Sequence, residues 1–141
     1  MRLLVVEDEV KLAQYLHKGL SENGHVVDLA HDGVEALDYL FGTGAHAGRD
    51  LNVMPQLILL DLNMPRVNGL QVLERIRADE RTKRLPVVIF TSSNEEQDML
   101  SSYDLGANSY IRKPVDFVQF LEASKHLGLY WMVLNQSAPV K

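Results

Sequence analysis

The sequence contains no cysteine, which excludes both disulfide bonds and metal sites built from thiolates. Basic residues are outnumbered, 14 against 19 acidic ones, and no basic run suggests nucleic-acid binding. No apolar run approaches the roughly 20 residues of a membrane span, and the apolar start is too short for a signal-peptide core. These absences lead us to expect a cytoplasmic protein that binds neither nucleic acid nor membrane.

The composition is that of one globular domain. The chain has 141 residues, of which 46% are hydrophobic and 23% charged. A domain of this size buries a core without covalent staples.

Five short apolar runs alternate with segments of helical spacing, and this alternation predicts an α/β fold with a parallel sheet between helices. The runs are Leu3–Val6, Val26–Ala30, Leu57–Leu60, Val87–Phe90 and Ser109–Ile111. In each helical segment the apolar residues predict one buried face; they are Ala13, Leu16 and Leu20; Val34, Leu37 and Leu40; Leu70, Leu73 and Ile76; Met99, Leu100 and Tyr103; and Phe117, Phe120 and Leu121. The long stretch 42–55 fits either an exposed surface loop or an arm that contacts a partner.

Polar residues follow four of the five predicted strands. They are Glu7, Asp8 and Glu9; Asp61 and Asn63; Thr91; and Lys113 and Pro114. Ligands of open parallel sheets bind at the carboxyl ends of the strands. If the first and third strands are neighbours, three carboxylates converge, and such a group needs protons or a cation. Oxygen ligands favour Mg2+, and Mg2+ with Lys113 would stabilise a phosphoryl group on Asp61.

Each of these residues also has an ordinary structural interpretation. Glu7, Asp8 and Glu9 fit acids beside the start of a helix, and Asp61 fits a residue that caps a turn. The joint placement at one edge of the sheet favours a site.

Four segments resemble the receiver domains of two-component response regulators, over residues 1 to about 127. "VVEDE" is similar to the family's acid pair, with Glu7 in place of the commoner first aspartate. "LLDLNMPRVNG" resembles the phosphorylation strand and loop, with Asp61 as phosphoacceptor. "VIFTSS" resembles the strand that ends in a hydroxyl, here Thr91. "SYIRKP" resembles the segment with the switch aromatic Tyr110, Lys113 and Pro114, the last a candidate for a cis peptide bond.

The resemblance implies a flavodoxin-like receiver fold, with five parallel strands in the order 2-1-3-4-5 and five helices. It also implies phosphoryl transfer to Asp61 from a sensor histidine kinase. Glu7, Asp8, Asp61 and the Asn63 carbonyl would hold Mg2+, while Lys113 and Thr91 would support the transfer. Thr91 and Tyr110 would then switch the conformation. No enzymatic activity is expected beyond Mg2+-dependent self-phosphorylation and slow autodephosphorylation.

The later part of the chain resembles single-domain regulators that serve bacterial phytochrome kinases. Residues 1–127 are expected to form the receiver domain and residues 128–141 an apolar extension, with no output domain. Trp131 and its apolar neighbours fit either an extension that folds back over the chain's own fifth helix and fifth strand or a partner surface. We expect the second, a homodimer through the fourth helix, the fifth strand, the fifth helix and this extension.

Three alternatives remain beside the phosphoacceptor. A phosphatase with an aspartate nucleophile would carry a second aspartate where Asn63 stands. A flavin carrier would have its phosphate repelled by Glu7, Asp8 and Glu9. A degenerate receiver that acts only as a scaffold would not need the intact acid, hydroxyl and lysine positions.

Overall fold

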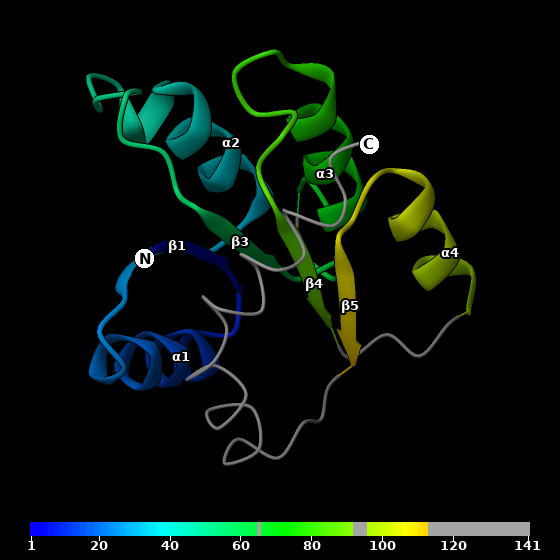
Figure 1. The fold of residues 1–141 in the computed structure, drawn as a ribbon, viewed down its shortest axis with the longest axis horizontal. Helices are drawn as coiled ribbons and strands as arrows, with labels where there is room; N and C mark the ends of the chain where they lie inside the picture. Colours follow the sequence, from blue (N-terminus) through cyan, green and yellow to red (C-terminus); the bar gives the residue numbers. More distant parts are fainter. Residues whose placement is uncertain (65, 92–95, 113–141) are drawn as a thin grey trace.

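The structure, a computed structural model, describes residues 1–64, 66–91 and 96–112 (Figure 1). One sheet of five parallel strands runs through it in the order β2-β1-β3-β4-β5, as predicted. The strands are β1 (Arg2–Val6), β2 (Val26–Ala30), β3 (Leu57–Leu60), β4 (Val87–Thr91) and β5 (Ser109–Arg112). The fold class inferred from the sequence is confirmed.

Helices connect the strands. They are α1 (Val10–Glu22), α2 (Gly33–Phe41), α3 (Gly69–Ala78) and α4 (Glu96–Asp104), with a short 3-10 helix η1 (Gly44–His46) after α2. The expected fifth helix and the extension 128–141 lie outside the described residues, as do Lys113 and Pro114.

Both faces of the sheet are covered, which explains why β1, β3 and β4 are apolar at every position except Arg2, the first of β1, and Thr91, the last of β4. Successive side chains of a strand point to opposite faces. Leu4, Ile58 and Ile89 pack with α2 and α3 on one face. Leu3 and Leu57 pack with α1 on the other face. Parallel strands between two helical layers are buried on both sides, so β1, β3 and β4 offer rigid supports for whatever follows their last residues.

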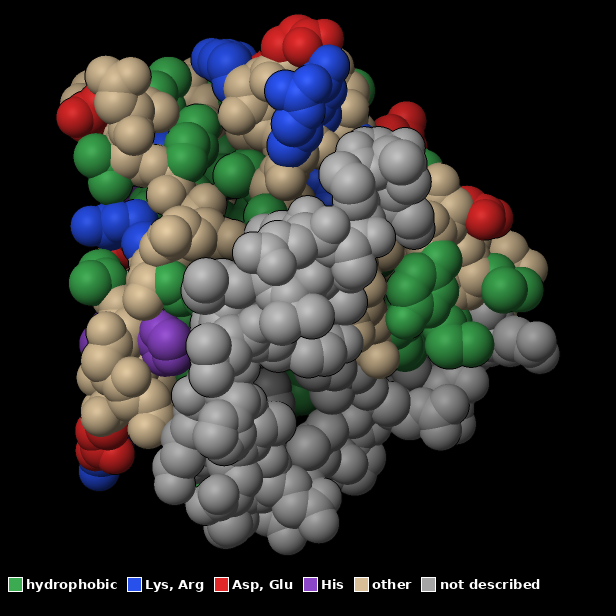
Figure 2. All heavy atoms as spheres, in the orientation of Figure 1, with side chains coloured by type: hydrophobic (Ala, Val, Ile, Leu, Met, Phe, Trp, Pro, Cys, Tyr) green, Lys and Arg blue, Asp and Glu red, His purple; other side chains and the backbone are tan. Residues whose placement is uncertain are grey.

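The predicted buried face of α4 is wrong. Met99, Leu100 and Tyr103 are 36%, 49% and 47% exposed, respectively, and hydrophobic side chains gather over the position of α4 in Figure 2. Helical spacing shows that side chains share a face but not that a neighbour covers it. Here α4 lies beside β5, the outer strand of the sheet, and it is Ser102 that is fully buried.

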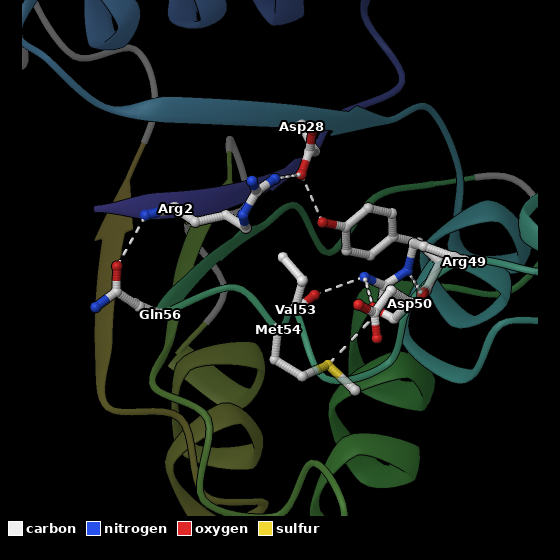
Figure 3. A network of polar contacts seen from close by, with 8 residues as sticks. Arg2, Asp28, Arg49, Asp50, Val53, Met54 and Gln56 are labelled. Carbon is white, nitrogen blue, oxygen red and sulfur yellow. Dashed lines mark hydrogen bonds and ion pairs between the residues drawn. The ribbon is translucent and has the colours of Figure 1, made fainter.

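The long stretch 42–55 lies on the surface and is held by one arginine. The Arg49 guanidinium lies 4.0 Å from the centre of the Tyr39 ring. It also donates hydrogen bonds to the carbonyl oxygens of Tyr39 at 2.5 Å and Val53 at 2.6 Å (Figure 3). The segment is therefore a surface loop with a fixed internal anchor, and its second interpretation, as an arm that contacts a partner, stays a prediction.

Tyr39 extends this anchor to the sheet. Its hydroxyl donates to Asp28 Oδ2 at 2.5 Å, and the same oxygen accepts from Arg2 at 2.9 Å (Figure 3). Burial, followed by the hydrogen bond to Asp28, raises the pKa of Tyr39 to about 12. The loop, α2 and the β1–β2 edge thus form one connected unit.

None of the helices that the structure describes has both the length and the apolar composition of a membrane-spanning segment.

Candidate phosphoacceptor and metal site

Neighbouring strands bring the predicted acids together. In the parallel register Val6 of β1 lies opposite Leu60 of β3, so the next residues, Glu7 and Asp61, leave the sheet side by side. Backbone hydrogen bonds extend this register: the Asp61 amide donates to the Val6 carbonyl at 3.1 Å, and the Glu7 amide to the Ala30 carbonyl at 2.9 Å. The positions of these two acids are therefore set by the sheet.

Glu7, Asp8 and Asp61 form one carboxylate cluster. Each offers an oxygen atom, and these atoms all lie within 4.8 Å of one another. Glu7 is 2% exposed and Asp61 5%, whereas Asp8 is exposed. At the start of α1, Glu7 Oε2 accepts a hydrogen bond from the amide of the N-cap residue Glu9 at 3.2 Å. This local contact does not involve Asp61, so it does not account for the convergence of the three carboxylates.

The donor set of this cluster fits a hard divalent cation. Carboxylates held this close, two of them buried, repel one another unless protons or a cation join them. All three donors are carboxylate oxygens, which suit Mg2+ together with water and a phosphate oxygen. The three residues could therefore hold such an ion.

Asn63 connects the acid cluster to the end of β4. Its backbone amide donates to Asp61 Oδ1 at 3.1 Å, and its side-chain amide donates to Thr91 Oγ1 at 3.3 Å. Thr91 is fully buried. Asn63 thus links the hydroxyl of Thr91 to the carboxylate of Asp61, the predicted phosphoacceptor.

Tyr110 lies on the strand next to Thr91. It pairs with Ile89, and Thr91 pairs with Arg112, so Thr91 and Tyr110 belong to the same face of the sheet. The Tyr110 side chain packs, partly buried, against the core formed with α2 and α3. This arrangement is compatible with a coupled movement of the two side chains. Lys113 and Pro114, also expected at this edge, fall outside the described residues.

Sequence reasoning did not single out Asp32 and Arg66. Asp32 caps the start of α2 by accepting a hydrogen bond from the Glu35 amide at 2.7 Å, and Arg66 donates to its other oxygen at 2.5 Å. Burial by itself raises the pKa of Asp32, but the hydrogen bonds from Glu35, Arg66 and Val34 and the charge of Arg66 together outweigh it and leave the pKa below its ordinary value. An Asp before a helical segment signals the cap, but no local signal pairs it with a residue 34 positions away.

Comparisons with known proteins agree with this geometry. A family model described as the response regulator receiver domain matches residues 3–125. The probable methanogenesis regulatory protein FilR2 of Methanothrix harundinacea is 33% identical over 137 residues, which are 96% of this chain and 86% of that protein. The chain spans about half the length of the transcriptional regulators it also matches. One of them is DltR of Streptococcus agalactiae, 38% identical over 86% of this chain and 49% of its own length.

Solved structures give the same result. The phosphorylated cyanobacterial phytochrome response regulator RcpA is 35% identical, with a TM-score of 0.81 and 93% of both chains covered. The response regulator Rcp1, in a Mn2+-bound form, is 30% identical, with a TM-score of 0.80 over 92% of this chain and 93% of that one. From the matching family model, the relatives and the strand order together, the chain belongs to the response regulator receiver domain family.

Proposed function

We propose that the chain is a phosphoacceptor response regulator, which receives a phosphoryl group on Asp61 from a phosphohistidine of a sensor kinase. The observation that carries this proposal is the convergence of Glu7, Asp8 and Asp61 within 4.8 Å, with two of the three carboxylates buried. Membership of the receiver family supports it, as does the position of Asp61 at the end of a rigid, fully buried strand.

In the transfer, an Asp61 oxygen forms a bond to phosphorus while the bond from phosphorus to the donor's imidazole nitrogen breaks. Little covalent chemistry is left to the protein, so position and charge decide the rate. Glu7, Asp8 and Asp61, with the Asn63 carbonyl, would hold Mg2+, which when bound neutralises charge on the phosphoryl oxygens. The Asn63 amide fixes the direction of the Asp61 carboxylate by its hydrogen bond to Oδ1. Lys113 is proposed to add a second positive charge.

The product is proposed to be the signal. Phosphorylation adds a charge of about −1.5 to −2, and the Thr91 hydroxyl would exchange its contact with Asn63 for a phosphoryl oxygen. A full population reversal needs about 5.5 kcal/mol, whereas one hydrogen bond to a charged group contributes roughly 1.5–3 kcal/mol. Thr91 alone therefore gives a partial shift, which Tyr110, Lys113 and a binding partner would complete.

A phytochrome-type sensor kinase is the proposed partner, supported by the likeness to RcpA. The proposed signalling form is a homodimer through α4, β5 and the segments that follow. The exposed apolar residues Met99, Leu100 and Tyr103 of α4 support that surface, because contiguous apolar patches of a monomer are usually interaction sites.

The direct test is incubation with a small phosphodonor and Mg2+, followed by intact mass measurement. The wild-type chain should gain one phosphoryl group, and Asp61→Asn should gain none. Full labelling of Asp61→Asn would contradict the assignment of Asp61. Repeated turnover of phosphate monoesters without a stable adduct would instead favour an aspartate-nucleophile phosphatase, and absence of any labelling would favour a scaffold.

A further inference from the structure

The start of α2 is tied by an ion pair to the β3–α3 loop, of which residues 61–64 and 66–68 are described. Arg66 of the loop donates to Asp32 Oδ2 at 2.5 Å. Arg66 is the only charged residue between Asp61 and Gly69. Among the described residues it is also the one non-glycine residue with a positive φ, 65°. That backbone conformation is unfavourable for a residue with a Cβ atom, and it occurs at the residue whose side chain reaches Asp32.

A second contact acts at the same place. A Cβ atom added at Gly33 would collide with the Val67 carbonyl, which means that the first turn of α2 rests directly on the loop backbone. The ion pair and this close approach hold two successive loop residues, Arg66 and Val67, against α2.

The loop held in this way is the one that orients the phosphoacceptor. Asn63 donates to Asp61 Oδ1 through its backbone and to Thr91 through its side chain. The Leu62 carbonyl accepts from both Met64 and Gly69, which ties the start of the loop to the start of α3. A displacement at Arg66 would therefore be passed to Asn63 and from there to the direction of the Asp61 carboxylate.

The segment before α2 also contacts the other side of the site. The Ala30 carbonyl accepts from the Glu7 amide at 2.9 Å, and His31 Nδ1 lies 3.4 Å from the Glu7 carbonyl oxygen. Residues 30–33 thus touch both the backbone that carries Glu7 and the loop that follows Asp61.

We propose that Asp32 and Arg66 form a positioning pair, which accelerates phosphoryl transfer to Asp61 by holding the β3–α3 loop without touching the reacting atoms. This inference rests on the proposed function of Asp61. It predicts that the two residues act as one unit, so that removal of either has the effect of removing both.

The variants are chosen to keep the local structure. Asp32→Asn removes the charge but keeps a good N-cap. Arg66→Asn removes the guanidinium and tolerates a positive φ. Arg66→Lys keeps the positive charge. The matched control is the exposed ion pair between Arg81 and Asp79, at 3.0 Å in the α3–β4 connection, changed by Asp79→Asn and Arg81→Gln.

The measurement is the initial rate of phosphorylation by intact mass, at saturating Mg2+ and donor and under conditions where denaturant curves show every variant folded. Each of Asp32→Asn and Arg66→Asn should be slower by roughly two- to tenfold, the lower part of the range that coupled contacts give. The double variant should be no slower than the single ones, Arg66→Lys should recover part of the rate, and the control pair should leave the rate unchanged.

Three results overturn the positioning role: single variants at the wild-type rate, a double variant slowed by the product of the two single effects, or an equal loss in the control pair. Each of these leaves the proposed function standing, because the wild-type chain still labels on Asp61. A wild-type chain that accepts no phosphoryl group overturns the proposed function and this inference together.

Discussion

At the scale of single residues, variants of Asp8 and Thr91 would separate the proposed chemistry from the proposed switch. Asp8 is the exposed member of the carboxylate cluster, so Asp8→Ala should weaken Mg2+ binding and phosphorylation together. Thr91→Ala should still accept the phosphoryl group but shift conformation poorly, because it removes only the hydroxyl that Asn63 now contacts. Titration with Mg2+ measures metal binding, intact mass measures phosphorylation, and amide hydrogen exchange measures the conformational shift. Normal labelling and normal switching in both variants would show that these roles are misassigned.

Tyr39 gives a prediction for alkaline pH. Its pKa is raised to about 12 in the folded chain, against about 10 in the unfolded one. Between about pH 10 and pH 12 the Tyr39 hydroxyl keeps its proton in the folded chain but loses it in the unfolded chain. The contribution of Tyr39 to the free energy of unfolding is therefore complete below about pH 10 and is lost as the pH rises towards 12. Urea unfolding at about pH 8 and pH 11 should show a loss of stability in the wild-type chain.

Tyr39→Phe is the control for this effect. The variant should be less stable at neutral pH by about 1 kcal/mol, the usual contribution of one hydrogen bond, because Asp28 loses a donor. Its stability should then fall less steeply between the two pH values. An equal fall in both proteins would exclude Tyr39 as the group responsible.

The positions of the acids could be predicted from the sequence, but the contacts that hold them could not. The rule that parallel strands end at one edge of the sheet places Glu7, Asp8 and Asp61 together once β1 and β3 are neighbours. The hydrogen bond from Asn63 to Thr91 spans 28 positions, and the ion pair between Arg66 and Asp32 spans 34. Such pairs depend on the packing of loops in space, about which spacing along one chain carries no information.

At the scale of secondary-structure elements, the junction between α2 and the β3–α3 loop depends on Gly33. Gly33→Ala would place a methyl group against the Val67 carbonyl. Although alanine favours helices, the backbone has to shift, and we expect a destabilisation of about 1–3 kcal/mol, the usual cost of overpacking. Urea unfolding measures it.

Gly24→Ala is the comparison for Gly33→Ala. Gly24 has a φ of 87° and no atom within 4 Å of an added Cβ, so its variant carries backbone strain without a collision and should lose about 1 kcal/mol. A Gly33→Ala chain as stable as the wild type would show that α2 moves away from the loop at little cost.

Elements differ in how far their burial can be predicted. The runs Leu57–Leu60 and Val87–Phe90 are apolar throughout because both faces are covered, and the structure extends the second by only Thr91. The spacing of α4 predicts a shared face equally well, yet that face is exposed. The sequence does not predict the 3-10 helix η1. The loop around it is held by a tertiary contact, the stacking of Arg49 on Tyr39, and spacing along the chain carries no signal for such a contact.

At the scale of the whole molecule, the two edges of the sheet differ in what they expose. The β2 edge carries Val26, which is 52% exposed, and the neighbouring α1 carries Val10 and Tyr15, which are 55% and 45% exposed. Beside the opposite edge, three exposed apolar residues lie within five successive positions of α4. Single exposed apolar residues are ordinary, but a group of them marks an interaction surface. A symmetric dimer would use the same α4 surface on both copies.

Leu100→Lys tests whether the α4 surface takes part in the proposed dimer. Trp131→Ala tests whether the extension 128–141 takes part, as the sequence predicts. Leu100 is 49% exposed, so a lysine there should leave the fold intact while it places like charges opposite each other across a two-fold axis. Light scattering at micromolar concentration should show a wild-type dimer and a monomer for both variants, all still labelled on Asp61. Val26→Lys, on the far edge of the sheet, should remain dimeric. A wild-type chain that stays monomeric with and without phosphodonor would rule out the dimer, and a Leu100→Lys chain that stays dimeric would exclude α4 from the interface.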